Sequence, residues 1–360
     1  MTKSKWGWRQ VALLALLLVQ WTSAESPAST NFEDYGTCSL DEAGSVGCKS
    51  SVSLDVQVGV GCKPKKLNFV AGAESSDAAK NCGEDAYYVV QDSRYVSFGV
   101  ADGVGGWQES GVDPSAFSLA LVEGAKIDFE RADESPRPQN LLESAFAHVK
   151  AGGDKNPGGS TAVFLVLDRS TGVLETANLG DSGYLVIRQN QKLFRSVEQT
   201  WAFNAPFQLS LYPSSMGESV DHYLPNDAFV TTHSLQHGDI VIVGSDGLFD
   251  NVFDEEILAE AEKYLNDVFE AHQEYKAQLE QGDITKPLPK DVQASVKKAM
   301  EDLSFALTDM ANEFAHDSTL ESPFSKLARE GYGYEFSGGK VDDTTVVAVY
   351  IHPQDTSPAL

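Results

Sequence analysis

The sequence predicts an α+β protein in which helices cover the faces of an extensive sheet system. Short segments rich in Val, Ile, Tyr, Phe and Thr recur along the chain and end at Gly, Asp or Asn, as strands do. Between them, apolar residues repeat with a helical period. The helical segments come in pairs and do not alternate strictly with strands, which favours antiparallel strand pairing over βαβ units.

Length and composition are typical of a globular enzyme. The chain has 360 residues, of which 42% are hydrophobic and 22% charged. Domains usually have about 100 to 200 residues, so the length allows one large domain with appendages or two domains. We divide the chain into a signal peptide or targeting segment (1–24), a flexible linker (25–51), a folded domain (52–352) and a tail (353–360).

The N-terminus has the order of a secretory signal peptide. Lys3, Lys5 and Arg9 precede the apolar run 11–19, and small residues follow up to Ala24. The run is shorter than the ~20 apolar residues that a spanning helix needs, so no stable membrane span is expected if this segment is cleaved. The sequence predicts the secretory pathway or secretion; an uncleaved anchor and an organelle presequence are the alternatives.

The charge balance excludes one class of partner. The chain has 27 basic and 53 acidic residues, a net charge of −26. Without the three basic residues of the signal peptide, 24 basic residues face 53 acidic ones, a net of −29. A polyanion would be repelled and no basic stripe offsets this, so nucleic acid is not an expected partner.

Four cysteines lie in the first quarter of the chain, at positions 38, 48, 62 and 82. None has Cys-x-x-Cys spacing, so a zinc site is not expected. In an oxidising compartment Cys38 and Cys48 could pair across a Gly-containing loop. Buried or unpaired thiols are the alternative.

Eight segments are predicted as strands from their β-branched and aromatic residues. In chain order they are 52–60, 86–90, 95–101, 161–168, 174–179, 184–188, 240–244 and 344–351.

Four segments are predicted as helices. Asn140 can cap a helix with Glu143 as its capping-box partner. A longer helix is predicted over 292–314, and 115–131 and 254–265 are further candidates. Residues 266–290 are polar and contain two prolines, which predicts a surface excursion.

Acidic residues lie at the ends of predicted strands in five places. A hydrophobic strand delivers its terminal residue to the rim of the sheet, where a carboxylate is costly unless it is solvated, hydrogen-bonded or bound to a cation. One strand followed by Asp-Gly is usually only a turn. Five such places together indicate a metal site, and they are Glu84-Asp85, Asp102, Asp181, Asp246 and Asp342-Asp343.

An oxygen-only ligand set predicts Mg²⁺ or Mn²⁺ as cofactor, because hard cations prefer carboxylates, carbonyls and water. Two such ions about 3.5 to 4 Å apart can share a carboxylate and activate a bridging water for in-line attack on a phosphomonoester. This chemistry needs no Ser, Cys or His nucleophile. The glycines after Asp102 and Asp246 let backbone carbonyls approach an ion.

The motifs occur in the order found in a known family. Six motifs succeed one another along the chain: Gly-Glu84-Asp85, Asp102-Gly103, Gly158-Gly-Ser-Thr-Ala162, Gly180-Asp181-Ser182, Ser245-Asp246-Gly247 and Asp342-Asp343-Thr344. The chain resembles the PPM family, the type 2C metal-dependent Ser/Thr protein phosphatases, over about residues 52–352. Three segments resemble the mitochondrial and plastid subgroup of this family: Val100-Ala-Asp-Gly-Val-Gly-Gly-Trp107, Phe203–Ser210 and Ser322-Pro-Phe.

The resemblance implies two stacked antiparallel β-sheets flanked by helices, an α-β-β-α sandwich with the metals in a cleft at one end. It implies phosphoprotein substrates and two metal ions with a possible third. We also expect a monomer. In this resemblance, Asp102 would bridge both ions, and Asp246 and Asp342 would complete the ligand shell of one ion. The Gly103 carbonyl would bind the other ion, and Glu84 and Asp85 would act partly through water. Asp181 would bind a third ion.

Two positions depart from the family pattern. Many relatives have His after the Asp-Gly pair, where it is proposed to protonate the leaving alcohol, but this chain has Val104. Relatives often place Arg four residues before the Glu to hold the substrate phosphate. Here Lys80 occupies that position and can supply a point charge but not a bidentate fork. Lys63, Lys65 and Lys66 are interpreted as a solvated turn.

Two other functions stay open at this point. A member of the same fold could be a catalytically weak regulatory or binding protein, or it could hydrolyse small phosphorylated metabolites. The location is also open, because the N-terminus predicts secretion whereas the subgroup implies a mitochondrion or plastid.

Overall fold

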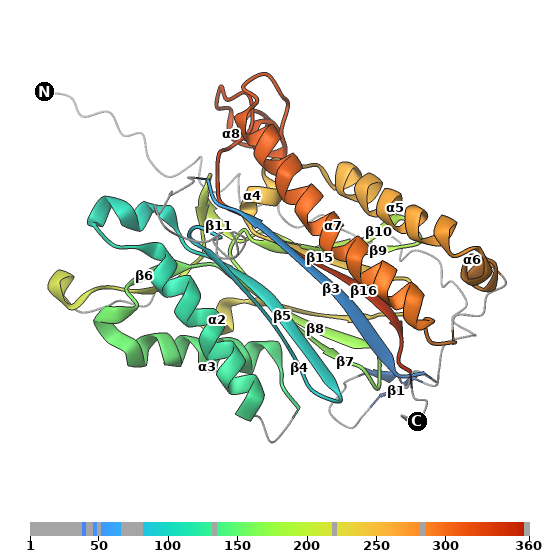
Figure 1. Ribbon diagram of the computed structural model, residues 1–360. Coiled ribbons are helices and arrows are strands. Elements are labelled where there is room, and N and C mark those ends of the chain that lie inside the picture. The colour runs from blue at the N-terminus through green and yellow to red at the C-terminus, as the bar shows by residue number, and fades with distance from the viewer. Residues whose placement is uncertain are drawn as a thin grey trace, which may run out of the picture. The chain divides into compact units, whose positions relative to one another are not determined.

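Two five-stranded antiparallel sheets form the centre of the structure (Figure 1). The computed structural model describes residues 38–40, 46–48, 52–65, 82–131, 135–217, 222–280 and 285–355, all of which belong to the unit formed by residues 36–360. The first sheet has the order β10-β9-β15-β16-β3, and the second has the order β14-β8-β7-β5-β4.

The strands have these bounds. In the first sheet they are β3 (Leu54–Lys63), β9 (Gly183–Arg188), β10 (Gln191–Arg195), β15 (Ile240–Gly244) and β16 (Thr344–Pro353). In the second sheet they are β4 (Asp85–Gln91), β5 (Tyr95–Asp102), β7 (Ala162–Asp168), β8 (Val173–Leu179) and β14 (Phe229–Ser234). All eight predicted strands are therefore present.

The two sheets stack on each other through apolar side chains. Phe98 and Leu165 of the second sheet and Val241 and Val347 of the first belong to one fully buried cluster. Strand residues point alternately to opposite faces, so every second residue reaches this shared core. The residues between them face the helices on the outside.

Helices cover the outer face of each sheet (Figure 1). On the second sheet, α2 (Pro114–Arg131) and α3 (Pro138–Gly152) bury Phe117 and Phe146 against Phe164. On the first sheet lie α4 (Asp246–Phe249), α5 (Asp254–Ala271), α6 (Gln273–Glu280) and α7 (Lys290–His316). The predicted α+β fold, with two antiparallel sheets between helices, is confirmed.

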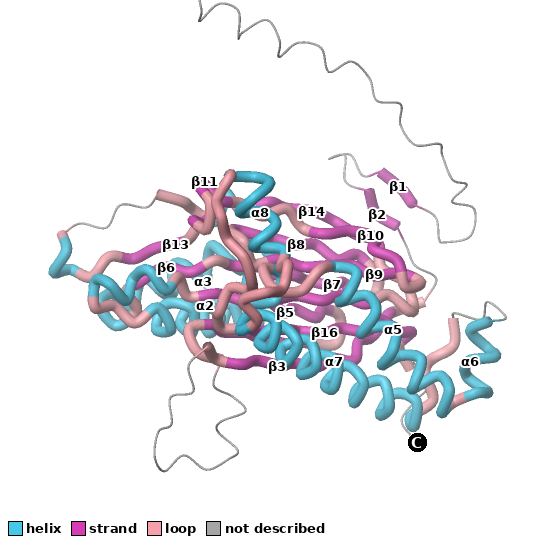
Figure 2. The backbone as a smooth tube through the Cα atoms, turned by 90° about the horizontal axis from the view of Figure 1, so that it is seen from above, coloured by secondary structure: helices cyan, strands magenta, loops and turns pink. Residues whose placement is uncertain are grey.

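Smaller elements lie outside the main sheets. Figure 2 shows β6 (Gly158–Ser160) beside β13 (Leu209–Leu211), and β11 (Thr200–Ala202) pairs with β12 (Ala205–Pro206). The remaining elements are α8 (Pro323–Tyr332) and the 3₁₀ helices η1 (Gly105–Ser110), η2 (Gly153–Lys155), η3 (Ser214–Met216) and η4 (Pro225–Asp227). No helix in the described part of the chain combines the length and apolar character that crossing a bilayer requires.

Three predictions about helices and strands need correction. The predicted cap at Asn140 is wrong, because α3 begins at Pro138 after Arg137, and proline's fixed φ suits a first helical turn. The predicted surface excursion is wrong for its first half, since α5 continues to Ala271 and α6 follows.

The strands β10 and β14 were not predicted. Both are edge strands with largely exposed residues, so they lack an apolar run.

The N-terminal segment and the cysteines also differ from expectation. The segment 25–51, interpreted as a linker, contains the hairpin of β1 (Cys38–Leu40) and β2 (Val46–Cys48), in which Cys38 lies opposite Cys48. A disulfide that the sequence did not indicate joins Cys62 at the end of β3 to Cys82 just before β4. It therefore links a strand of the first sheet to the entrance of the second.

A glycine on β3 allows α7 to pack closely on the first sheet. A Cβ at Gly59 would lie 2.1 Å from the backbone carbonyl carbon of Met300 in α7. Real Cβ atoms do not approach backbone so closely, so a side chain at position 59 would push the helix away from the sheet.

We expect Gly59→Val to destabilise the fold by about 1–3 kcal/mol, because the added side chain overpacks the contact between β3 and α7. Urea unfolding followed by circular dichroism would measure the change. Gly106→Ala is the matched control, since a Cβ at that position meets nothing within 4 Å. Equal stability of the two variants would contradict this explanation of Gly59.

Candidate metal centre

The predicted acidic residues meet at one edge of the sandwich because of strand direction. Asp102 ends β5, and Asp85 begins the antiparallel neighbour β4, directly opposite it in the register. In the first sheet, Asp246 follows the end of β15, and Asp342 precedes the start of antiparallel β16. Asp181 lies in the connection from β8 to β9, which runs from the second sheet to the first.

A hydrogen bond joins the two sheets at this edge. Ser245, the residue after β15, donates from Oγ to Oδ2 of Asp85 at 2.7 Å. The same Oγ accepts the backbone N–H of Thr345 at 3.0 Å. The orientation of Asp85 in the second sheet is therefore set by the first sheet.

Glu84 is held by a turn that another carboxylate organises. Asp343 accepts the backbone N–H of Glu84 at 3.0 Å and that of Lys65 at 2.7 Å. Gly83 makes the turn with a φ of 74°, and a Cβ there would lie 2.1 Å from Asp343 Oδ1. Asp343 thus positions the Glu84 backbone and leaves the Glu84 carboxylate to face the cluster.

The Gly103 backbone is fixed beside Asp102. Its N–H donates to the carbonyl oxygen of Glu84 at 3.2 Å. The Asp102 carbonyl accepts the N–H of Thr161 at 2.9 Å, and Gly103 forms a β-bridge with Ser160. The Gly158–Ala162 motif of the sequence therefore supports the strand end from which Asp102 projects.

Lys340 inserts its ammonium group among three carboxylates. Its Nζ forms ion pairs with Asp246, with Asp250 at 2.9 Å and with Asp342 at 3.2 Å. Burial alone would lower the pKa of Lys340, but the three carboxylates raise it well above its ordinary value. Lys340 therefore stays charged. Its place in the site was not predicted from the sequence, because a lone lysine has no recognisable pattern.

Lys65 also inserts its ammonium group among carboxylates, and it pairs with the other carboxylate oxygen of Asp342. Its Nζ lies 2.8 Å from Glu84 Oε2, 3.0 Å from Asp342 Oδ1 and 3.4 Å from Asp343 Oδ2. Its interpretation as part of a solvated turn is wrong, because its side chain is mostly buried in the acidic cluster. Lys63 is more exposed and pairs with Asp309, as a surface residue would.

The remaining carboxylates repel one another. Burial raises the pKa of Asp102 well above its ordinary value, and the charges of Asp85, Asp246, Asp342 and Asp181 raise it further. Burial is also the main cause of the raised pKa of Asp85 and of Asp181. Asp342 differs, since Lys340 and Lys65 outweigh its burial and lower its pKa. The cluster is short of positive charge around Asp102.

Three carboxylate oxygens support a cation at this edge. Oδ1 of Asp85, of Asp181 and of Asp246 are buried and have no hydrogen-bond partner. Within the described ranges, no three acidic, His or Cys side chains surround one point as metal ligands would, because the two lysines lie between the carboxylates. An all-oxygen set with unpartnered lone pairs nevertheless fits a hard divalent cation.

The structure thus brings together every predicted site residue that it describes. These are Glu84, Asp85, Asp102, Gly103, Asp181, Asp246 and Asp342. Lys80, the predicted phosphate-binding residue, lies outside the described residues, so its role stays a prediction. Lys65, Lys340 and Asp250 join the site only through the tertiary fold.

Comparison with known proteins gives a consistent set of relatives. The profile of the family described as Stage II sporulation protein E (SpoIIE) matches residues 92–308. The 5-azacytidine resistance protein azr1 of Schizosaccharomyces pombe is 35% identical over 272 residues, which are 75% of this chain and 82% of that protein. The protein phosphatase PTC7 homolog of Homo sapiens is 35% identical over 266 residues, 74% of this chain and 78% of that protein.

A solved structure has the same fold. The X-ray structure of the photosystem II phosphatase PBCP is 29% identical in sequence, with a TM-score of 0.61. The match covers 82% of this chain and 98% of that chain. The protein of that solved structure and the human relative are both named as phosphatases.

We expect Lys340→Met to destabilise the protein in the presence of a chelator by about 3–5 kcal/mol, because three buried carboxylates lose their shared cation. Urea unfolding in chelator measures this loss. Added Mn²⁺ should restore more stability to the variant than to the wild type, because the freed carboxylates bind the ion. Lys298→Met is the control, since Lys298 forms an exposed pair with Asp302. An unchanged unfolding free energy would contradict this role of Lys340.

Proposed function

The chain belongs to the PPM family of PP2C-type protein phosphatases, and from that premise we propose that it is a metal-dependent Ser/Thr protein phosphatase. Its cofactors in this proposal are two Mg²⁺ or Mn²⁺ ions. The observation that carries the proposal is the buried acidic edge, where three carboxylate oxygens have no protein partner.

The chain's own residues would hold the cofactor from both sheets. Asp102 faces the other four aspartates and would contact both ions, whereas Asp246, Asp342 and the Gly103 carbonyl would complete their shells. When bound, the ions would supply an activated water and neutralise charge on the phosphate. Glu84 and Asp85 would act through water, and Asp181 would serve a third ion.

The lysines would tune the charge of this centre. Lys340 and Lys65 already neutralise part of the acidic cluster through Asp342, Asp246 and Glu84. They would keep Asp342 ionised and ready to bind a cation, because they lower its pKa. The carboxylates with raised pKa values, Asp85, Asp102 and Asp181, would instead lose their protons when the ions bind.

The leaving alcohol would obtain its proton from water. Val104 follows the Asp102-Gly103 pair and has no group that can donate a proton. We therefore propose that general-acid catalysis by a side chain at this position contributes nothing here, and that positioning and charge neutralisation provide most of the rate enhancement.

Location and assembly remain proposals from the sequence. The N-terminal segment supports the secretory pathway, with a mitochondrion or plastid as the alternative, and residues 1–37 lie outside the described residues. A fluorescent fusion of residues 1–50 would decide, and mitochondrial or plastid fluorescence would overturn the secretory proposal. We also retain the proposal that the protein is a monomer.

We expect the purified protein to hydrolyse phosphothreonine peptides with Mn²⁺ or Mg²⁺ and to stop when a chelator is added. Asp102→Asn should lower kcat/KM at least about 100-fold, because the residue that interacts with four other aspartates of the centre loses its charge. Phosphate release measures the rate. Asp309→Asn, an exposed aspartate on α7 that pairs with Lys63, is the matched control.

Three outcomes would overturn this proposal. Retained activity in Asp102→Asn would show that the ligand assignment is wrong. A strong preference for sugar or nucleotide phosphates over phosphopeptides would point to small metabolites as substrates. Silence with both metals, together with no metal binding by calorimetry, would leave a regulatory or binding protein.

A further inference from the structure

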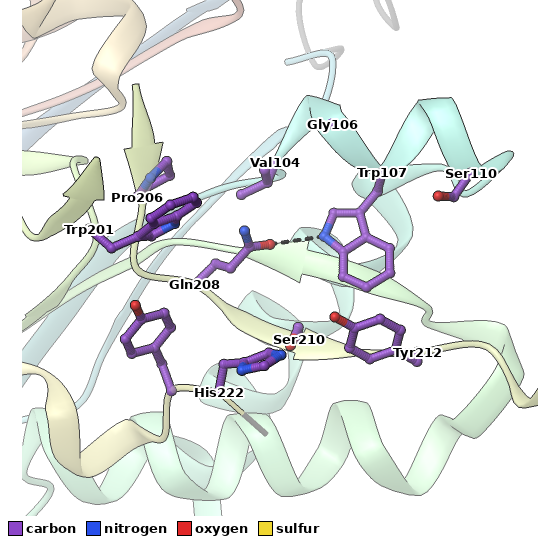
Figure 3. A pocket seen from close by; sticks show the side chains of 11 residues that line it. Val104, Gly106, Trp107, Ser110, Trp201, Pro206, Gln208, Ser210, Tyr212 and His222 are labelled. Carbon is purple, nitrogen blue, oxygen red and sulfur yellow. Dashed lines mark hydrogen bonds between the residues drawn. The ribbon is translucent and has the colours of Figure 1, made fainter. Parts of the chain in front are cut away.

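A pocket of about 540 Å³ is lined by Val104, Trp107, Trp201 and Tyr212, among other residues (Figure 3). We propose that it binds an aromatic side chain of the protein substrate, a few residues from the phosphorylated position. This inference rests on the proposed phosphatase function and adds a specificity-determining site to it. The volume lies within the range of about 300–1,000 Å³ that is usual for ligand pockets.

One short helix connects the pocket to the metal centre. Val104 lines the pocket and lies only two residues after Asp102, at most about 7.6 Å away between Cα atoms. The helix η1 follows at once, and Gln108 within it donates a hydrogen bond to the Glu84 carboxylate. Trp107, its neighbour in the helix, lines the pocket. A substrate at the metal centre therefore lies next to the pocket.

Several side chains of the pocket wall are already held in place. Trp107 donates from Nε1 to Oε1 of Gln208 at 2.9 Å, and its ring meets Tyr212 edge-on with centroids 4.9 Å apart (Figure 3). Tyr223 stacks on Phe207 with centroids 4.0 Å apart. These rings need no rearrangement before they contact a ligand, which lowers the entropic cost of binding.

Trp201 forms the open side of the pocket. It projects from the short strand β11, and 69% of its surface is exposed. A tryptophan left this accessible beside other rings is a typical anchor for a partner, because aromatic residues dominate the energetics of interfaces. An inserted ring would remove both itself and Trp201 from water.

The chemistry of the lining selects an aromatic occupant. Among the lining residues that the structure describes, none is Asp, Glu, Lys or Arg, although the chain has 53 acidic residues. An arginine or lysine side chain would lose hydration without a carboxylate to pair with, and cation–π contact would compensate only in part. A phenylalanine or tyrosine ring would gain edge-to-face contacts with Trp107 and Tyr212 and carries no charge that must be desolvated.

The distance restricts where the aromatic residue lies in the substrate. An extended peptide advances about 3.3–3.6 Å per residue. The pocket begins about two residues' length from Asp102 and extends from there to Trp201 and Tyr212. We therefore place the aromatic residue about two to four positions from the phosphorylated residue.

Matched phosphothreonine peptides test this proposal. Each carries Phe, Ala or Arg at one position two to four residues from the phosphothreonine, on either side. We expect kcat/KM to be about 10- to 100-fold higher for the Phe peptide at the preferred position than for its Ala and Arg counterparts, mainly through KM. Dissociation constants of the same peptides with a non-hydrolysable phosphonate, measured by fluorescence anisotropy, should follow the same order.

Substitution of the exposed tryptophan locates the effect. Trp201→Ala should lower the preference for the Phe peptide over the Ala peptide in both KM and dissociation constant, because only the contacts with Trp107 and Tyr212 remain, and Trp201→Phe should restore part of the loss. Leu193→Ala, which removes another exposed apolar side chain on β10, is the control and should keep the preference of the wild type. A preference that Trp201→Ala leaves undiminished would overturn the assignment.

The outcomes separate this inference from the proposed function. Hydrolysis of all peptides without preference for Phe would overturn the pocket and leave the phosphatase function standing. A preference for Arg would show a cationic occupant and would also overturn it. Without any hydrolysis, tight Phe-dependent binding that Trp201→Ala weakens would still support the pocket, and equal binding of the three peptides would refute it.

Discussion

Mutual repulsion among five aspartates, three of them buried and two half-buried, is the constraint on which the functional end of this protein depends. Asp102 faces the carboxylates of Asp85, Asp181, Asp246 and Asp342, and burial makes their charges costly. Two lysine ammonium groups offset part of this charge, yet three carboxylate oxygens still have no partner. Divalent cations supply the missing positive charge in the proposed function. Cofactor binding and the stability of this edge therefore both depend on the charge of the acidic cluster.

The sandwich provides the rigidity that this balance requires. Carboxylates from two different sheets stay close because the sheets share an apolar core and because Ser245 links the first sheet to Asp85 of the second. The same arrangement also determines which elements lie around the site. The helix η1 contacts Glu84 through Gln108 and the aromatic pocket through Trp107, so chemistry and proposed substrate selection share one short element.

The sequence by itself determined the strands and the acidic positions. Segments such as 95–101 and 240–244 are buried strands in which hydrophobic burial and β-propensity agree, so their existence and the residues at their ends could be predicted. The order of the Asp-Gly motifs then indicated the family and the metal ligands. Edge strands β10 and β14 escaped prediction because their exposed residues leave no apolar pattern.

Only the tertiary structure decided which residues from distant segments meet. Lys65 and Lys340 read as ordinary surface lysines until the fold places each beside Asp342, and Cys62 and Cys82 read as isolated thiols until β3 and the entrance of β4 lie side by side. The aromatic pocket combines residues near 107, 201, 212 and 223. Local patterns report burial and backbone preference, whereas such contacts depend on how strands are ordered in space, and that order leaves no periodic trace in the sequence.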